Sequence, residues 1–135
     1  MYKRQIEGGV TGDAPGGHPE ESQVRLGDGP GLFLYDSSEL PNRRMVALTK
    51  DVARAIGAPL QFDVAQGYGD DSAEIQRANG GAPTVNLVAP VRYTHAHNGV
   101  MNRADFDHLV DLTVALIGRL DASTVSRLRD FTPEP

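Results

Sequence analysis

The segment that decides the fold covers residues 83–120, with the sequence PTVNLVAPVRYTHAHNGVMNRADFDHLVDLTVALIGRL. Residues 83–88 form a short apolar run typical of a buried strand, and residues 102–120 repeat apolar side chains at helical spacing. Asn102 can cap this helix, and Asp105 stands three residues later, at the position that completes a capping box. A strand, a loop and a long helix in this order indicate an α/β protein.

The helix predicted for residues 102–120 carries one apolar stripe along its length. The stripe consists of side chains that recur every three or four residues, namely Phe106, Leu109, Val110, Thr113, Ile117 and Leu120. We expect this stripe to face the core, because an amphipathic helix buries its apolar side.

The chain before residue 83 repeats the same alternation of strands and helices. Residues 31–36 and 60–64 have the short apolar or alternating patterns of strands. Helices are predicted for residues 42–56 and 71–79, each of which is followed by glycine. A short amphipathic piece and a polar tail make up residues 122–135. The pattern therefore predicts a layered α/β structure.

The first 40 residues differ from the rest of the chain. They contain eight glycines and three prolines, which leave little room for a helix. By composition alone, this segment reads as a flexible tail or a long functional loop.

Composition limits the class of protein. The chain has 135 residues, the usual size of one domain, and a formal net charge of -5 without clustered cations, which argues against a nucleic-acid partner. It has no cysteine, so disulfides and zinc–thiolate sites are excluded and any metal must bind His, Asp or Glu. No apolar run is long enough to cross a bilayer and no signal-peptide core is present, so a cytoplasmic chain without a membrane partner is expected.

Two histidines stand in the loop between the predicted strand at residues 83–88 and the long helix. His95 and His97 are two residues apart, so in an extended segment they would share one side. Imidazole is the commonest metal ligand in proteins, but a pair of loop histidines is more often solvated or hydrogen-bonded. The residues by themselves leave both readings open.

Acidic residues in three segments are further candidates. Asp70 and Asp71 end a glycine-rich segment, residues 67–71, and their carboxylates could bind a cation or a substrate amine, or the segment could be only a glycine turn with an acidic helix cap. Asp36 follows a predicted strand and could be a turn residue. Glu7, beside two glycines, reads by itself as a solvated side chain.

Six short blocks occur in a characteristic order between Ile6 and about Leu120. They are residues 6–16 (IEGGVTGDAPG), 26–30 (LGDGP), 35–38 (YDSS), 67–72 (GYGDDS), 81–84 (GAPT) and 90–95 (PVRYTH). Together they resemble the metallo-aminopeptidases of peptidase family forty-two, in clan MH. This family includes glutamyl and deblocking aminopeptidases, some of which assemble as tetrahedral dodecamers.

The resemblance implies part of a three-layer α/β/α catalytic domain with a mixed sheet, lacking its N-terminal half. It implies two divalent metal ions, which could be zinc, cobalt or manganese, and Glu7 and His95 would be ligands of these ions. Asp36, Asp71 and Arg92 would lie near the metal or the substrate. The substrate would be a peptide that loses its N-terminal residue, and the whole enzyme would be a homo-oligomer, as large as a dodecamer in some members.

Some positions depart from the family pattern. Asp70 stands where the family usually has threonine, Ala96 where it has serine, and Gly99 where glutamate is common. These departures concern the substrate preference more than metal binding. The resemblance assigns no role to His97.

The resemblance also indicates what this chain does not supply. Family members have roughly twice this length or more, and their upstream part contributes another histidine ligand, a bridging aspartate and a Glu–Glu pair that includes the general base. We therefore expect no catalytic residue and no peptidase activity in this chain alone. Residues 1–5 read like a translated sequencing adapter, residues 6–121 as the C-terminal part of the catalytic domain, and residues 122–135 as a short helix and tail.

Two other functions stay open. The chain could be a non-catalytic α/β binding module that keeps the peptidase fold. It could also belong to a glycoside hydrolase, which needs paired carboxylates across a sugar cleft, for which Asp36 and Asp71 are the candidates. The histidine loop has no role in that second mechanism.

Overall fold

The computed structural model describes residues 3–18, 20, 22–130 and 132. The expectations for residues 1 and 2 and for the tail at residues 133–135 lie outside this part of the chain. The strands are β1 (Lys3–Val10), β2 (Gly31–Asp36), β3 (Gln61–Ala65), β4 (Thr84–Arg92) and β5 (Val100–Met101). The helices are α1 (Arg43–Ile56), α2 (Ser72–Arg77), α3 (Arg103–Gly118) and α4 (Ala122–Arg129), and a 3₁₀ turn, η1 (Ala78–Gly80), follows α2.

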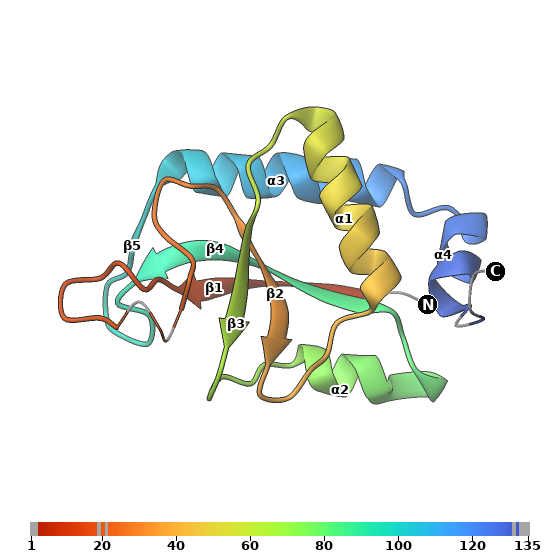
Figure 1. The fold of residues 1–135 in the computed structure, drawn as a ribbon, viewed down its shortest axis with the longest axis horizontal. Coiled ribbons are helices and arrows are strands. Elements are labelled where there is room, and N and C mark those ends of the chain that lie inside the picture. Colours follow the sequence, from red (N-terminus) through yellow and green to blue (C-terminus); the bar gives the residue numbers. More distant parts are fainter. Residues whose placement is uncertain (1–2, 19, 21, 131, 133–135) are drawn as a thin grey trace.

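The strands form one mixed sheet in the order β1–β4–β2–β3, with β5 paired to β4. The pairs β1–β4 and β2–β3 are parallel. The two halves meet antiparallel through only two residue pairs, Gly31 with Val88 and Leu32 with Leu87. Figure 1 accordingly shows β2 and β3 crossing β1 and β4 at a steep angle.

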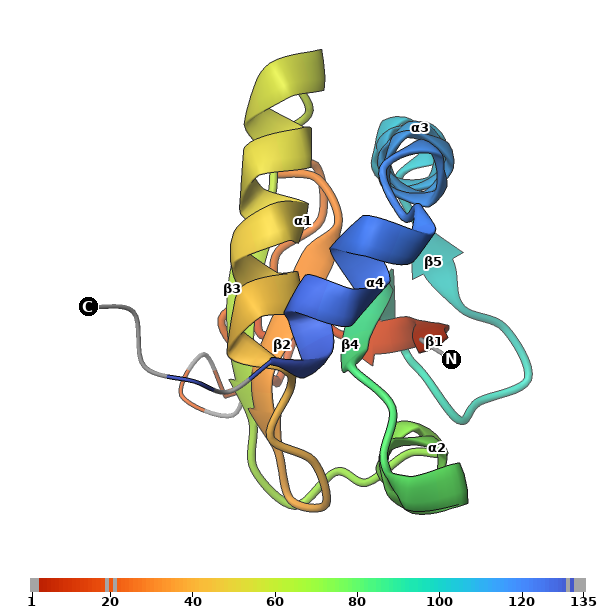
Figure 2. The same ribbon diagram turned by 90° about the vertical axis from the view of Figure 1, so that its right-hand side faces the viewer.

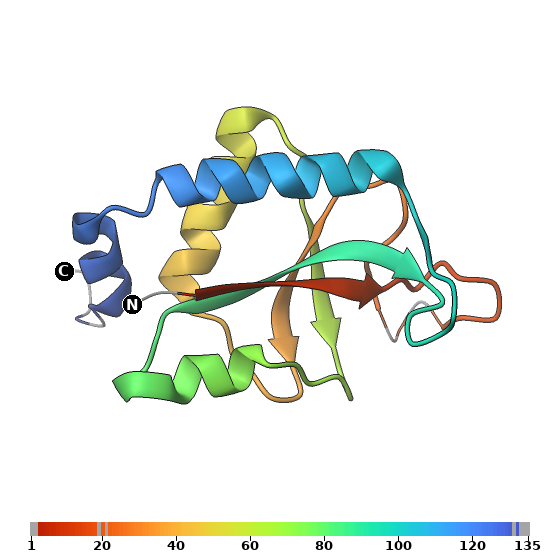
Figure 3. The same ribbon diagram turned by 180° about the vertical axis from the view of Figure 1, so that it is seen from behind.

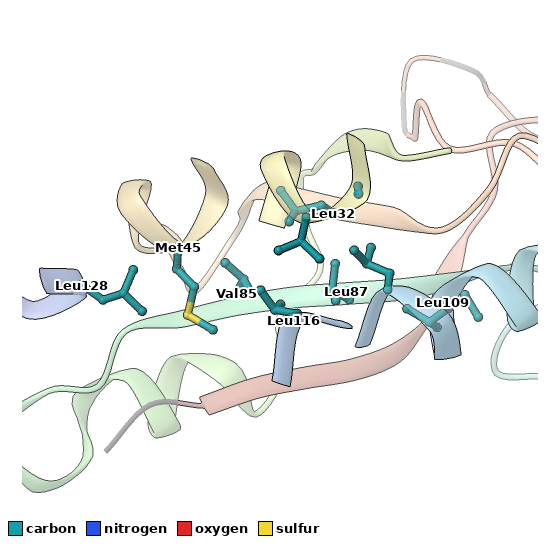
Figure 4. Close-up of a cluster of buried hydrophobic side chains, with 11 residues drawn as sticks. Leu32, Met45, Val85, Leu87, Leu109, Leu116 and Leu128 are labelled. Carbon is teal, nitrogen blue, oxygen red and sulfur yellow. The ribbon is translucent and has the colours of Figure 1, made fainter. Parts of the chain in front are cut away.

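Helices cover both faces of this sheet. α1, α3 and α4 lie on one side and α2 on the other (Figures 2 and 3). The larger core cluster lies under α1, α3 and α4 and includes Leu32, Met45, Val85, Leu87, Leu109, Leu116 and Leu128 (Figure 4). The smaller cluster, Phe33, Ala65 and Val88, lies on the opposite face, because neighbouring residues of a strand point to opposite sides. The expected three-layer arrangement with a mixed sheet is confirmed.

The structure of the segment before residue 31 contradicts the expectation, drawn from composition, of a flexible tail or a long loop. Residues 3–10 are neither a tail nor a loop but strand β1, paired along its length with β4. A Cβ atom built on Gly9 would lie 2.6 Å from Val88 Cγ2, and one on Gly31 would lie 2.7 Å from the same atom. These glycines are needed for close packing around Val88 and not for flexibility.

β4 is longer than the strand predicted for residues 83–88. It continues through Pro90 to Arg92, although proline lacks the backbone N–H that a ladder uses. In the structure β2 pairs with β4 at Leu87 and Val88 and β5 pairs with it at Val91 and Arg92, so Pro90 falls between the two partners.

The buried face of α3 also differs from the prediction. Its buried residues are Asp105, Leu109, Leu112 and Leu116, so only Leu109 of the predicted stripe is buried. Exposed apolar residues continue along another side of the same helix, which made the sequence periodicity ambiguous. Asn102 caps the helix as predicted, since its side chain accepts a hydrogen bond from Ala104 N.

Asp105 does not serve the capping box predicted for it. It is 1% exposed, and its carboxylate accepts hydrogen bonds from Gly27 N at 2.7 Å and Gly29 N at 2.9 Å. The start of α3 thus holds the turn before β2 in place. Within the described residues, no helix is long and apolar enough to span a membrane.

Candidate metal and substrate site

A pocket of about 90 Å³ opens on the face of the sheet that carries Phe33 and Ala65. Segments far apart in the sequence contribute to it: β1, the end of β3, the loop after β3 and the loop after β4. The polar side chains in its lining are Glu7, Ser22, Asp63, Tyr68, Asp70 and His95. Both side chains that the resemblance implies as metal ligands, Glu7 and His95, therefore line one pocket.

Glu7 owes its direction to the register of β1 on β4. It pairs with Val88 in a parallel ladder, and paired residues project to the same face of a sheet. Val88 belongs to the smaller core cluster, so Glu7 also points to that face. A shift of β1 by one residue would turn the carboxylate to the other side.

His95 is positioned by an unusual loop backbone. Tyr93 has φ 62° and His95 has φ 62°, in the left-handed region that residues other than glycine seldom adopt. The segment is therefore not extended, so the condition under which His95 and His97 would share one side is not met. His95 lines the pocket, whereas His97 is exposed and is not among the described residues of its lining.

Arg92 binds the loop after β1 and is not among the described residues that line the pocket. Its Nη2 lies 2.6 Å from Asp13 Oδ2, and its Nε donates to Asp13 Oδ1 at 3.4 Å. The hydrogen bond from Arg92 lowers the pKa of Asp13 below its ordinary value, and Asp13 in turn raises the pKa of Arg92. This ion pair fixes the end of β4 against the turn that follows β1.

Asp36 and Asp71 occupy different surroundings. Asp36 is 2% exposed, and its Oδ1 accepts hydrogen bonds from Ser38 N, Ser38 Oγ and Glu39 N, each at 2.7 Å. Asp71 is exposed at the start of α2, where its side chain makes no capping hydrogen bond within the described chain. Neither is among the described residues of the pocket lining.

The sequence patterns predicted no site role for Glu39 or Asn86, and they pointed to Asp70 only together with Asp71. Asp70 lines the pocket, and its Oδ1 accepts a hydrogen bond from Ser72 N at 2.8 Å. Asn86 on β4 donates from Nδ2 to Asp70 Oδ2. Asp70 was one of the two carboxylates in residues 67–71 that could bind a cation or a substrate amine, and the structure places it in the pocket lining. Glu39 carried no sequence signal, because nothing local shows that a turn residue will be buried.

Burial governs the charge state of two of these carboxyls. Loss of hydration raises the pKa of Glu39, and the negative charges of Asp36 and Asp70 raise it further. Burial also raises the pKa of Asp70, with a smaller contribution from Asp36. Both groups therefore lie in surroundings that disfavour their ionised forms.

Asp63, by contrast, has a structural part in the pocket wall. It is 1% exposed, and its carboxylate accepts hydrogen bonds from Ser22 Oγ at 2.9 Å and Gln23 N at 2.8 Å. These bonds fasten the segment before β2 to β3. The alternating pattern of residues 60–64 could not show this, because the partner groups lie far away in the sequence.

A larger pocket of about 500 Å³ lies near the start of α1, the end of α2 and the end of α4. The described side chains that line it include Arg43, Gln76 and Arg129 but neither a carboxylate nor an imidazole. It lacks the donors that a divalent metal needs, so the smaller pocket is the candidate site.

The comparisons with known proteins agree with the resemblance. A sequence model of the M42 glutamyl aminopeptidase family matches residues 5–112. The FrvX protein of Escherichia coli (strain K12) is 34% identical over 126 residues, which are 93% of this chain and 35% of FrvX. The chain thus spans about a third of that relative.

Two solved structures show the same fold. The TET aminopeptidase from the marine sediment archaeon Thaumarchaeota archaeon SCGC AB-539-E09 has a TM-score of 0.90 at 34% identity, over 94% of this chain and 35% of that one. PhTET1-12s, a dodecamer in its asymmetric unit, has a TM-score of 0.74 at 25% identity, over 88% of this chain and 34% of that one. The chain therefore belongs to the M42 glutamyl aminopeptidase family.

Proposed function

We propose that this chain is part of the catalytic domain of an aminopeptidase that removes N-terminal residues from peptides. One observation carries the proposal: Glu7 on β1 and His95 after β4, far apart in the sequence, line the same pocket. Membership of the M42 family supports the peptidase class.

The residues of the pocket fit a divalent metal. A carboxylate, Glu7, and an imidazole, His95, are ligands of the kind that zinc, cobalt and manganese accept, and the carboxylate of Asp70 lies in the same lining. We propose that Glu7 and His95 each hold one ion of a pair. When bound, such ions lower the pKa of a water molecule and polarise the scissile carbonyl.

The chain's own contribution is to hold these ligands in place. β1 fixes the direction of Glu7 through its ladder with β4, and the left-handed backbone at His95 turns the imidazole toward the pocket. The pair of Arg92 with Asp13 joins the segments that follow these two strands. We also propose that Asp36 and Asp71 support the site from outside the pocket lining. One carboxylate oxygen of Asp36 lies within 4.8 Å of one of Asp70, which lines the pocket.

The 135-residue chain by itself is expected to be inactive. By the resemblance, the family's remaining ligands and its general base lie in the upstream part of the enzyme, and the 35% share of FrvX that this chain covers supports this proposal. Two protein ligands would leave a divalent ion mostly hydrated. Purified chain should therefore hydrolyse aminoacyl-p-nitroanilides no faster than a blank that contains only the metal.

A graft tests the proposed ligands. This chain would replace the matching 35% of the Thaumarchaeota TET aminopeptidase, and hydrolysis of aminoacyl-p-nitroanilides would be measured with Zn²⁺, Co²⁺ or Mn²⁺. We expect Glu7→Gln and His95→Ala to lower kcat/KM by about 100-fold or more. His97→Ala is the matched control and should change kcat/KM less than about threefold, because His97 is not among the described residues that line the pocket.

The graft also separates the competing functions. An active graft whose rate is unaffected by Glu7→Gln and His95→Ala would reject the proposed ligands. A folded graft without activity would favour a non-catalytic binding module. The glycoside hydrolase alternative has weaker support, because neither Asp36 nor Asp71 is among the described residues that line the candidate pocket, and the histidine loop has no role in that mechanism.

We further propose that the whole enzyme is a homo-oligomer. PhTET1-12s, which shares this fold at 25% identity, is a dodecamer in its asymmetric unit. The proposal applies to a protein with the full family length, and sedimentation analysis of the graft would test it. A cytoplasmic location stays a prediction from composition.

A further inference from the structure

Three carboxylates meet beside the pocket, where β2 and β3 end. Asp36 closes β2, Glu39 lies in the turn that follows, and Asp70 lies in the loop after β3. One oxygen atom from each lies within 4.8 Å of the others. Asp36 and Glu39 are only 2% and 3% exposed, so this negative charge is largely shielded from water.

Among the described residues, the three carboxylates of Asp36, Glu39 and Asp70 have no ion-pair partner. Buried carboxylates without a cationic partner carry a high energetic cost, so a cation or protons must compensate them. Asp71, next in sequence, is exposed and stands outside the cluster.

Several oxygens of the cluster are buried and unused. Asp36 Oδ2 and Glu39 Oε1 have no hydrogen-bond partner in the part of the chain that the structure describes. Asp36 Oδ1, by contrast, is already saturated by three donors, which leaves Oδ2 for another ligand. Buried polar atoms are normally paired, so these two indicate a missing partner.

Asn86 gives an independent indication from another strand. It is not acidic, lies on β4 and is 1% exposed. Its Nδ2 donates to Asp70 Oδ2, so its amide lies against the cluster, and its Oδ1 is also buried without a partner among the described residues. An amide carbonyl oxygen is a common ligand of hard cations.

We propose that Asp36, Glu39, Asp70 and Asn86 bind one hard divalent cation, of the calcium type, at a position distinct from Glu7 and His95. All four offer oxygen, which Ca²⁺ prefers over nitrogen. Ca²⁺–O bonds of about 2.3–2.6 Å place oxygens on opposite sides of the ion up to about 5 Å apart, so three oxygens that lie within 4.8 Å of one another can reach one ion. The ion joins β2, β4 and the loop after β3, and it fixes Asp70 in the pocket wall.

Calcium titration of the purified, chelator-treated chain tests this site. The test does not depend on the proposed peptidase function. Isothermal titration with Ca²⁺ alone should show one ion per chain. Saturating Ca²⁺ should raise Tm by roughly 10 °C at about 100 times Kd. Asp70→Asn and Glu39→Gln should each weaken binding by about tenfold or more, because each removes one charged ligand.

Asp71→Asn is the matched control, since it makes the same change of charge one residue away at an exposed position and should leave Kd unchanged. The proposal is overturned if no saturable binding occurs below millimolar Ca²⁺. It is also overturned if Asp70→Asn and Glu39→Gln bind Ca²⁺ as tightly as the unmodified chain, or if only Glu7→Gln reduces binding.

The buried negative charge could instead be neutralised by protons bound to the carboxylates, and this alternative predicts a different effect of the same variants on Tm. In that case Asp70→Asn and Glu39→Gln would raise Tm at neutral pH without any ion, and Ca²⁺ would leave Tm unchanged. This outcome would also overturn the cation site. Because Ca²⁺ binds imidazole poorly, neither result depends on whether Glu7 and His95 hold zinc or cobalt.

Discussion

Single residues show how far-apart segments are tied together at the candidate site. The Arg92–Asp13 ion pair joins the end of β4 to the turn after β1, with side chains 32% and 17% exposed. Asp105 and Asp63 tie other turns to the framework through backbone N–H groups. All three anchors connect segments that the sequence alone could not bring together.

The Arg92–Asp13 pair should make stability depend on pH in a defined direction. The pKa of Asp13 is lowered in the folded chain, mainly by the hydrogen bond from Arg92. The ion pair therefore stabilises the fold fully at pH values above 3.8, the ordinary pKa of an aspartate. This stabilisation is lost as the pH falls through the lower pKa that Asp13 has in the folded chain. Arg92→Gln should therefore lower the free energy of unfolding at pH 7, because it removes this hydrogen bond.

Urea titrations at pH 7 and at lower pH would check this expectation. The difference between Arg92→Gln and the unmodified chain should shrink as the pH falls below 3.8. Arg103→Gln is the control, because Arg103 and Asp107 form an exposed pair with side chains 83% and 51% exposed. A constant difference at all pH values would show that the pair acts through packing alone.

At the scale of elements, the position of β1 depends on glycine. β1 is an edge strand of the described sheet, and Gly9 packs directly against Val88 on β4. Because Glu7 lies on the same strand, the packing at Gly9 also fixes the direction of the proposed ligand. Composition suggested flexibility here, whereas the structure uses the missing side chain for close contact.

Gly9→Ala should destabilise the fold. The new Cβ would lie 2.6 Å from Val88 Cγ2, so β1 or β4 must shift, at a cost of about 1–3 kcal/mol. Gly118→Ala, at the end of α3, has nothing within 4 Å of its new Cβ and should stabilise the chain by about 0.4–1 kcal/mol. Thermal and urea unfolding would measure both changes, and equal effects would refute the packing role of Gly9.

At the scale of the whole molecule, one side of α3 stands out. Phe106, Val110, Val114 and Ile117 are 43%, 43%, 63% and 48% exposed and follow one another at helical spacing. This apolar stripe lies on a different side from the buried Leu109, Leu112 and Leu116. Exposed stripes of this kind promote association.

The isolated chain should therefore self-associate through this stripe. The double variant Val114→Glu with Ile117→Lys should shift sedimentation toward the monomer and change the free energy of unfolding by no more than about 0.5 kcal/mol. Leu112→Ala on the same helix faces the core and should cost about 2–5 kcal/mol without reducing association. Unchanged association in the double variant would show that another surface is responsible.

The sequence by itself determined the alternation of strands and helices, the cap at Asn102 and the family, because these depend on local spacing and on blocks that stand in a fixed order. The tertiary structure decided which side of α3 is buried, that residues 3–10 form a strand, and that Asp70 and not Asp71 lines the pocket. Strand register and backbone conformation set these features, and both depend on partners far away in the chain. The roles of Glu7 and His95 as metal ligands stay predictions.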